Sequence, residues 1–283
     1  MAPGSPTTSP LVTYTSDGEK TASADLMTVI AIAVIAYAGV NICHEILGHC
    51  TMAFLVGTKC KVISSTYIPL ATEVPTWKYN ILVPAGITAN WIAALACLVL
   101  LRRWKSARPT VRYFLWLLMA VNLFLSSTYV AVAPIIKFGD SYILIQKLPG
   151  QLFWRTAVAL VGATILFFSF RLCRDELSRL IGFGGTAARS LAWKLVAPAY
   201  VAGGIITVAS ALFSQLEAKW AQLEAAGGTF GLTIWLLILP LRIPAPGPSI
   251  ARPFVLDRSF AWITAGLVTT LLFIGVLGRG ISI

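Results

Sequence analysis

Residues 26–56 read LMTVIAIAVIAYAGVNICHEILGHCTMAFLV and are apolar almost throughout. The stretch is long enough to cross a bilayer, because a transmembrane α-helix needs roughly 20 predominantly apolar residues. Further stretches of this kind follow at residues 80–101, 111–135, 151–170, 195–214, 229–241 and 259–278. The sixth is short for a complete crossing and contains Pro240. This pattern predicts an all-α polytopic membrane protein with six or seven transmembrane helices.

The composition also excludes an ordinary soluble domain. Hydrophobic residues make up 57% of the chain and charged residues only 12%, whereas a soluble domain carries about 25% charged residues. So few charges cannot cover a water-soluble surface. The net charge of +11 does not indicate nucleic-acid binding, because membrane-length apolar stretches separate the basic residues. The five cysteines are odd in number and lie mostly in apolar stretches, so they predict no disulfide framework.

Basic residues gather in three of the predicted loops and orient the chain in the membrane. The clusters lie within residues 102–112, 171–194 and 242–258. With seven spans all three fall on one side, which the positive-inside rule makes cytoplasmic. The N-terminus is then inside and the C-terminus outside. A re-entrant segment at 229–241 would invert the last helix.

Three segments outside the spans have patterns of their own. Residues 1–25 are rich in Ser, Thr and Pro without the features of a signal peptide, and they predict a flexible tail. Residues 59–72 are rich in β-branched side chains and predict a strand or small hairpin at the membrane edge. Residues 211–226 predict an amphipathic helix in the membrane interface, ending at Gly227-Gly228.

The two histidines of the chain lie together in the first apolar stretch, as Asn41-Ile42-Cys43-His44-Glu45-Ile46-Leu47-Gly48-His49-Cys50. Ionisable groups at membrane depth cost about 2.5–3.5 kcal/mol or more each, so they are candidates for function. On a helix, Glu45 falls between the two imidazoles on one polar face. This is close to the zinc-metalloprotease pattern, in which two histidines bind the metal and the glutamate activates water. Cys43 and Cys50 project from the other side and are predicted to pack.

The spacing of the histidines differs from the usual metalloprotease motif. In H-E-x-x-H the histidines are four residues apart, about 40° around a helix. His44 and His49 are five residues apart, which in a regular α-helix separates them by about 140°. A π-bulge, or a break at Gly48, would make them converge. The motif therefore predicts a distorted helix.

A catalytic zinc usually has three protein ligands and an open position, so a third ligand is needed. No third histidine exists, and almost every other acidic residue lies in a tail or polar loop. Asp140 is the exception, and we expect Pro134 and Gly139 to place it on unwound backbone that lines a polar cavity. Two imidazoles and a carboxylate suit zinc. The alternative is that Asp140 caps a helix or pairs with Lys137.

Three motifs together resemble the site-2 protease family of intramembrane zinc metalloproteases. They are His-Glu-…-His, then Pro-Ala-Gly-…-Asn at Pro84, Ala85, Gly86 and Asn90, then Pro-…-Gly-Asp at Pro134, Gly139 and Asp140. The resemblance covers residues 26–150 and leaves 151–283 as additional transmembrane helices. It implies that His44, His49 and Asp140 bind Zn²⁺ and that Glu45 is the general base. It also implies that Asn90 lies near the site and orients substrate or the catalytic water.

This resemblance departs from the family in two ways besides the histidine spacing. Gly-Asp-Ser stands where the family more often has Asp-Gly, and no soluble insert is large enough for the PDZ domain that many members carry. The implied function is hydrolysis of a peptide bond in or near a transmembrane segment of another protein, in the lipid bilayer. The strand-like residues 59–72 would hold the unwound substrate by edge pairing.

Other functions compete with this interpretation. Diiron desaturases need many more histidines than two, ceramidase-like hydrolases need a third zinc histidine, and bis-histidine haem sites normally take their ligands from different helices. The open alternative is an inactive protease relative or a transporter-like protein that acts through membrane partners. In that case His44 and His49 would be core residues bonded to Asn122, Ser126 or Tyr129. Stoichiometric zinc that depends on the three predicted ligands would distinguish the two cases.

Overall fold

The computed structural model describes residues 22–68, 74–214, 219–243 and 254–282. Within these residues seven helical segments are long and apolar enough to cross a membrane: Leu26–Leu55, Thr76–Arg103, Pro109–Ile136, Gln151–Ile181, Gly185–Leu212, Ala225–Arg242 and Phe260–Leu277. The prediction of an all-α polytopic membrane protein is confirmed, at the higher of the two span counts. The short sixth stretch reaches membrane length because its helix already includes Ala225.

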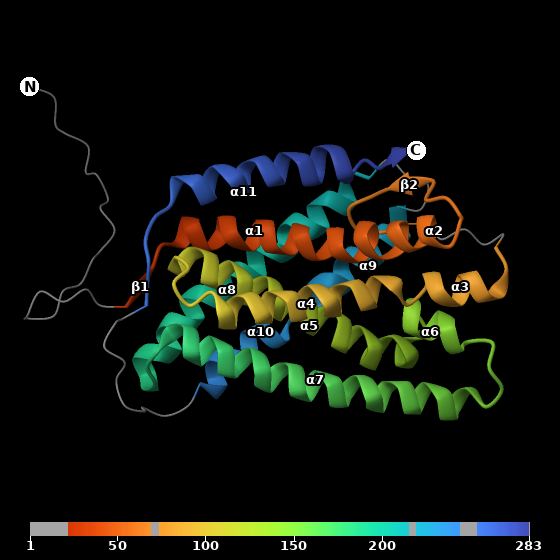
Figure 1. Ribbon diagram of the computed structural model, residues 1–283, viewed down its shortest axis with the longest axis horizontal. Helices are drawn as coiled ribbons and strands as arrows, with labels where there is room; N and C mark the ends of the chain where they lie inside the picture. The colour runs from red at the N-terminus through yellow and green to blue at the C-terminus, as the bar shows by residue number, and fades with distance from the viewer. Residues whose placement is uncertain (1–21, 69–73, 215–218, 244–253, 283) are drawn as a thin grey trace, which may run out of the picture.

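The spans lie side by side along the long axis of the molecule (Figure 1). Helix α1 (Leu26–Ile42) packs against α5 (Pro109–Ile136), α8 (Gly185–Leu212) and α11 (Phe260–Leu272). Helix α5 is the most buried span, whereas α7 (Gln151–Ile181) and α11 are the least buried and run along opposite edges of the bundle. Their exposed apolar faces suit contact with lipid.

The remaining helical elements are shorter or continue these spans. They are the π-helix η1 (Cys43–Cys50), α2 (Thr51–Leu55), α3 (Thr76–Leu82), α4 (Ala85–Arg103), α6 (Asp140–Ile145), α9 (Lys219–Leu232), α10 (Trp235–Ile238), the 3₁₀-helix η2 (Leu239–Arg242) and the π-helix η3 (Phe273–Leu277). The first span is therefore α1, η1 and α2 in succession, and η1 carries the histidine motif.

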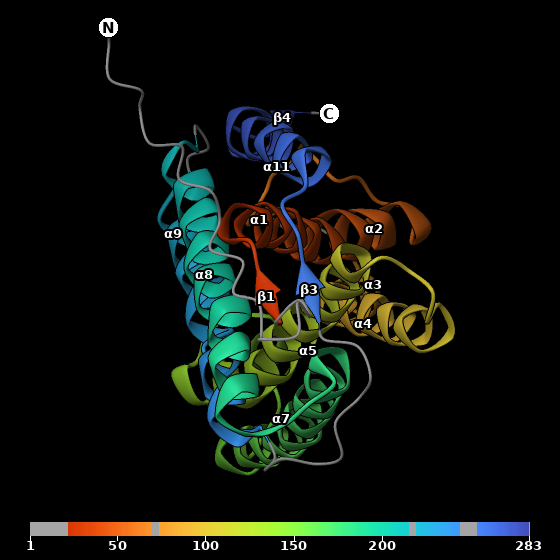
Figure 2. The same ribbon diagram turned by 90° about the vertical axis from the view of Figure 1, so that its left-hand side faces the viewer.

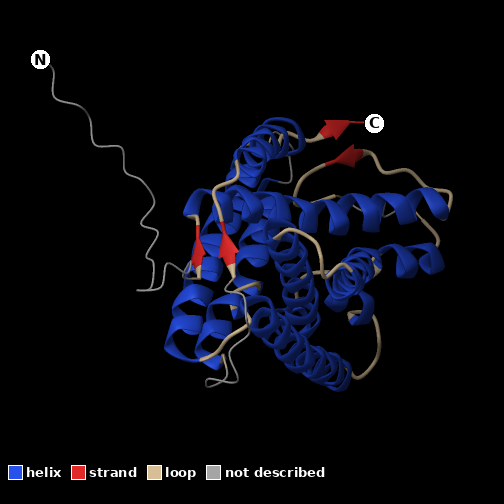
Figure 3. Cartoon of the chain, turned by 60° about the vertical axis from the view of Figure 1, so that its left-hand side comes forward, coloured by secondary structure: helices blue, strands red, loops and turns tan. Residues whose placement is uncertain are grey.

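Two small sheets lie at opposite ends of the bundle (Figure 3). Strand β2 (Val62–Ile63) pairs antiparallel with β4 (Ile281–Ser282). The predicted membrane-edge β element is thus present, but its partner is a strand from the far end of the chain instead of a hairpin neighbour. At the other end β1 (Ser23–Ala24) pairs in parallel with β3 (Val255–Leu256), as the end-on view of Figure 2 shows.

The predicted flexible tail is corrected at its C-terminal end. Residues 1–21 lie outside the described residues, but residues 23–24 form β1, and Asp25 caps α1. The Asp25 carboxylate accepts hydrogen bonds from the Thr28 N–H at 2.9 Å and the Thr28 hydroxyl at 2.8 Å. Aspartate is a strong N-cap because it satisfies N–H groups that have no partner within the helix.

The predicted helix end at Gly227-Gly228 is also corrected, because α9 continues through both glycines. A glycine costs a helix only about 1 kcal/mol relative to alanine. An unpaired backbone group in lipid costs several kcal/mol, which favours continuing the helix. Of the predicted interfacial segment 211–226, residues 215–218 lie outside the described residues, and its position at the interface remains a prediction.

Candidate metal centre

The histidine motif lies in a π-helix. In η1 the backbone hydrogen bonds join residues five apart instead of four apart. Side chains five residues apart therefore lie on the same face of the helix. The imidazole rings of His44 and His49 are accordingly neighbours, with centroids 5.0 Å apart. The predicted distortion is confirmed, in its π-helical form.

Gly48 has a different role from the predicted helix break. A Cβ atom there would lie 2.6 Å from the Cα of Gly86 and 2.9 Å from the Ala85 carbonyl oxygen. Such distances are too short for a side chain. Gly48 therefore lets η1 approach the start of α4 at backbone distance, which brings the two motifs into contact.

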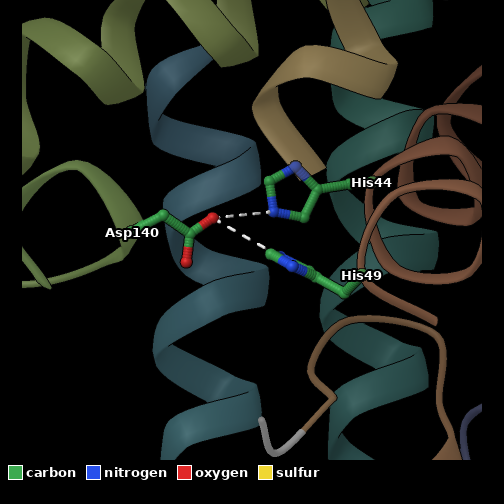
Figure 4. Close-up of side chains that lie close together, drawn as sticks. All are labelled: His44, His49 and Asp140. Carbon is green, nitrogen blue, oxygen red and sulfur yellow. Dashed lines mark ion pairs between the residues drawn. The ribbon is translucent and has the colours of Figure 1, made fainter. Parts of the chain in front are cut away.

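Asp140 reaches the histidine pair from a distant part of the chain (Figure 4). Its Oδ2 atom lies 3.4 Å from Nε2 of His44 and 3.4 Å from Nε2 of His49. The three residues each offer one ligand atom, and these atoms lie within 4.8 Å of one another. The structure thus brings together the three predicted ligands, in an arrangement that could hold a metal ion.

The local backbone at Asp140 differs from the prediction. Pro134 is inside α5, which continues to Ile136, and the chain turns at Lys137 (φ 60°) and Gly139 (φ 84°). Asp140 is then the first residue of α6, not part of an unwound segment. Its N–H donates to the Tyr129 hydroxyl at 3.3 Å. Among the described residues Asp140 forms no ion pair with Lys137, whose side chain is exposed.

The outer nitrogen of each imidazole also has a polar neighbour. Nδ1 of His49 lies 3.0 Å from the Leu82 carbonyl oxygen, to which it can only donate. Nδ1 of His44 lies 3.4 Å from the side-chain nitrogen of Asn90. Asn90 is fully buried, and its amide oxygen has no hydrogen-bond partner. The residue predicted to contact substrate therefore lies behind His44 and is not among those that line the cavity.

Glu45 is next to the three ligand candidates and is only 7% exposed. Its carboxylate accepts a hydrogen bond from the backbone N–H of Ile68. Ile68 belongs to the chain that follows β2, so the predicted strand segment reaches the site and contacts the predicted general base. Residues 69–72 of that segment lie outside the described residues.

These groups lie in a cavity of about 740 Å³. The motif helix, residues 66–68, the end of α5, residues 137–146 and one face of α9 line it. Most of the lining is aliphatic or aromatic, and its polar groups include the histidines, Glu45 and Asp140. Such a cavity is typical of a binding site that orients an apolar ligand through a few polar groups.

Asp140 is set up to be ionised. Burial alone raises the pKa of this carboxyl group, but the neighbouring imidazoles of His44 and His49 outweigh burial and hold the pKa well below its usual range. An ionised carboxylate is the form that binds metal. At the cavity wall, burial and the nearby acidic groups raise the pKa of Tyr67. Its hydroxyl therefore stays protonated as a hydrogen-bond donor.

The predicted packing role of Cys50 is corrected. Cys43 is a free, partly buried thiol, but Cys50 forms a disulfide with Cys60, across a Cα–Cα distance of 5.2 Å. The number and placement of the cysteines argued against a framework of several disulfides. They do not show whether one pair of cysteines lies close enough to form a single disulfide. The bridge fixes the chain before β2 to the residue that follows His49.

Several contributions to the site carry no local sequence signal. The Leu82 carbonyl, the Tyr129 hydroxyl and the face of α9 reach it only through packing. The alternative partners of the histidines do not bond to them: the Asn122 amide donates to the Leu118 carbonyl, the Tyr129 hydroxyl accepts from the Asp140 N–H, and the buried Ser126 hydroxyl has no hydrogen-bond partner. None of the three is hydrogen-bonded to His44 or His49 in the described part of the chain.

Comparison of this chain with protein-family models, with curated proteins and with solved structures finds no match in any of the three. The interpretation of the site therefore rests on its residues and their geometry.

Proposed function

We propose that this protein is an intramembrane zinc metalloendopeptidase of the site-2 protease type. Its substrate is another membrane protein, cut at a peptide bond in or near a transmembrane segment. The observation that carries the proposal is the convergence of His44, His49 and Asp140, with the Glu45 carboxylate beside them in one cavity. The family, the reaction and the identity of the metal are all part of the proposal.

The donor set fits zinc. Oδ2 of Asp140 is buried without a hydrogen-bond partner, and a cation between it and the two Nε2 atoms would satisfy all three. Two imidazoles and one carboxylate are ligands that zinc accepts, whereas magnesium and calcium prefer oxygen ligands alone. Iron(II) also takes two histidines and a carboxylate, so the metal must be identified by measurement.

The residues around the ligands have separable tasks. A zinc ion bound there would acidify a water molecule and polarise the scissile carbonyl. Glu45 accepts the proton of the attacking water and delivers it to the leaving amine, as a general base and then a general acid. The Ile68 N–H holds that carboxylate in place.

We further propose that Asn90 and Leu82 orient the imidazoles. The Leu82 carbonyl accepts the Nδ1 proton of His49 and leaves Nε2 free to bind metal. A half-turn of the Asn90 amide puts its oxygen against Nδ1 of His44. In that orientation the oxygen accepts the Nδ1 proton and leaves Nε2 of His44 free to bind metal. Asn90 thus acts on substrate only indirectly, as a positioning residue.

The cavity suits an extended apolar peptide. A helical substrate must unwind first, because its carbonyls are bonded within the helix. One edge of β2 is already paired with β4, so we place the unwound chain along residues 66–68, which follow β2 and line the cavity.

Metal analysis and a Glu45→Gln variant test the proposal together. Elemental mass spectrometry of the purified protein should find zinc in the wild type and lose it in His44→Ala and Asp140→Ala. Glu45→Gln should keep zinc but lose about 10²–10⁴-fold in cleavage rate, because it removes only the proton acceptor. Cleavage is measured as new protein termini in the membranes of cells that express each form.

Two outcomes would contradict the proposal. Wild type without zinc would remove the metal centre, and zinc-bound Glu45→Gln with wild-type termini would remove the role of Glu45. Either result would favour the inactive relative or the transporter-like protein.

A further inference from the structure

The cavity of the metal centre opens at one end of the helix bundle. Its deeper wall includes Asn41 and Leu125, whereas its rim includes two exposed residues of the α5–α6 turn, Lys137 and Phe138, and Gln146 beyond α6. The same end carries α3 and β2, which pairs with β4, and the other end carries β1, which pairs with β3 (Figure 1). The site is therefore accessible from one side of the membrane.

The basic clusters lie at the opposite end. Arg102, Arg103, Lys105 and Arg108 follow or flank the end of α4, and Arg174 and Arg179 lie near the end of α7. The seven helical segments of membrane length put these clusters, with Arg242 and Arg258, on one side, which is cytoplasmic by the positive-inside rule. The cavity then faces the non-cytoplasmic side.

The disulfide gives an independent indication of the same orientation. Cys50 lies in the last part of the first span, at the end of the bundle that holds the cavity, and Cys60 lies in the connection that follows this span. Disulfides persist in oxidising compartments and are rare in the cytosol. Charge distribution and thiol chemistry are unrelated, yet both place the metal centre on the non-cytoplasmic side.

We propose that the metal centre opens to the non-cytoplasmic face of the membrane, and that its substrates are membrane proteins cut where a transmembrane segment emerges on that face. The orientation stands on the two observations above. The substrate half rests in addition on the proposed protease function.

Thiol labelling in intact cells tests the orientation. Lys147 and Lys105 are exposed lysines in connections at the two ends of the bundle, and each is changed to cysteine in a Cys43→Ala background. A membrane-impermeant PEG-maleimide should shift Lys147→Cys in intact cells, and Lys105→Cys only after permeabilisation. The reverse pattern would overturn the proposed orientation.

Two further readouts separate the parts of the proposal. Alkylation of the wild type should modify Cys50 and Cys60 only after reduction, and free thiols at both positions without reduction would remove the disulfide argument. New termini produced by the wild type and not by Glu45→Gln should map to the non-cytoplasmic ends of substrate spans. Cytoplasmic termini would overturn the substrate half alone, whereas no new termini at all would contradict the protease function itself.

Discussion

An imidazole binds metal through one nitrogen, and the hydrogen bond made by its other nitrogen fixes the orientation of the ring. The Pro-Ala-Gly-…-Asn motif of α4 can be understood in these terms. A Cβ on Gly86 would lie 2.5 Å from Nε2 of His44, so glycine leaves room for that ring. Asn90, one helical turn later, contacts Nδ1 on the other side of the ring. The two residues fix the plane of His44 from one face of α4.

Replacement of Asn90 by leucine should weaken zinc binding about 10–100-fold, the usual effect of losing an outer hydrogen bond to a histidine ligand. The reason is that Nδ1 of His44 loses its acceptor and the ring loses its orientation. Zinc affinity by chelator competition measures the effect, and the visible spectrum of the cobalt-substituted protein reports any change in ligand geometry.

Two variants show whether the effect is specific. Asn90→Asp keeps an oxygen acceptor and should restore affinity. Asn122→Leu removes a similarly buried amide, one that bonds only to its own helix at the Leu118 carbonyl, and should leave affinity unchanged. Equal losses in Asn90→Leu and Asn122→Leu would mean that Asn90 is merely structural.

At the scale of an element, the π-helix is what makes the unusual motif workable. The wider π-helical turn of η1 accommodates the one extra residue between His44 and His49. Helices α1 and α2 therefore present the same faces to their neighbours as they would with a motif one residue shorter. The extra residue is not needed for convergence itself, since histidines four apart on a regular α-helix are only about 40° apart.

Deletion of Leu47 should therefore be tolerated. Its side chain is 57% exposed, and its loss turns the motif into His-Glu-Ile-Gly-His. We expect η1 to become a regular α-helix and zinc to remain at wild-type stoichiometry, as measured by elemental analysis. Insertion of one alanine after Leu47 is the matched opposite. It puts the histidines six residues apart, about 120° around a regular α-helix, and the helix would have to accommodate two extra residues instead of one, so we expect binding to be abolished. Zinc lost in the deletion would show that the π-helix itself is required.

At the scale of the whole molecule, the end opposite the cavity is held by buried charge. Glu176 of α7 is only 4% exposed, and its carboxylate pairs at 2.7 Å with Arg102 of α4 and at 2.7 Å with Arg179. The arginines are 51% and 63% exposed. The buried Glu176 carboxylate is therefore stabilised by the two guanidinium groups instead of by water, whereas each guanidinium group still contacts water.

Removal of the arginines should consequently cost more than removal of the glutamate. Arg102→Ala with Arg179→Ala leaves a buried unpaired carboxylate, which costs about 3–5 kcal/mol. Glu176→Gln should lower Tm less, in thermal unfolding of the detergent-solubilised protein. Arg174→Ala breaks only a partly exposed pair with Asp175 and should cost less than about 1 kcal/mol. Zinc content should be unchanged in all three, since the network lies far from the cavity. A larger fall in Tm for Glu176→Gln would contradict this order.

Much of this protein follows from its sequence alone. Apolar length determined the spans, because a bilayer accepts only segments that bond their own backbone. The five-residue histidine spacing predicted a distorted helix, because helical geometry leaves few ways for the rings to converge. Asp140 was selected because few acidic residues lie close to a span. These are local properties of composition and period.

Only the tertiary structure decided how distant segments meet. It brought Asp140 to the histidine pair, Asn90 and the Leu82 carbonyl to the outer imidazole nitrogens, and Cys60 to Cys50. It also paired β2 with β4 and carried α9 through its glycines. None of these contacts has a local pattern, because each depends on which helix faces pack together. Helix packing is determined by the fit of whole surfaces, such as Gly48 against Gly86, and not by any one segment.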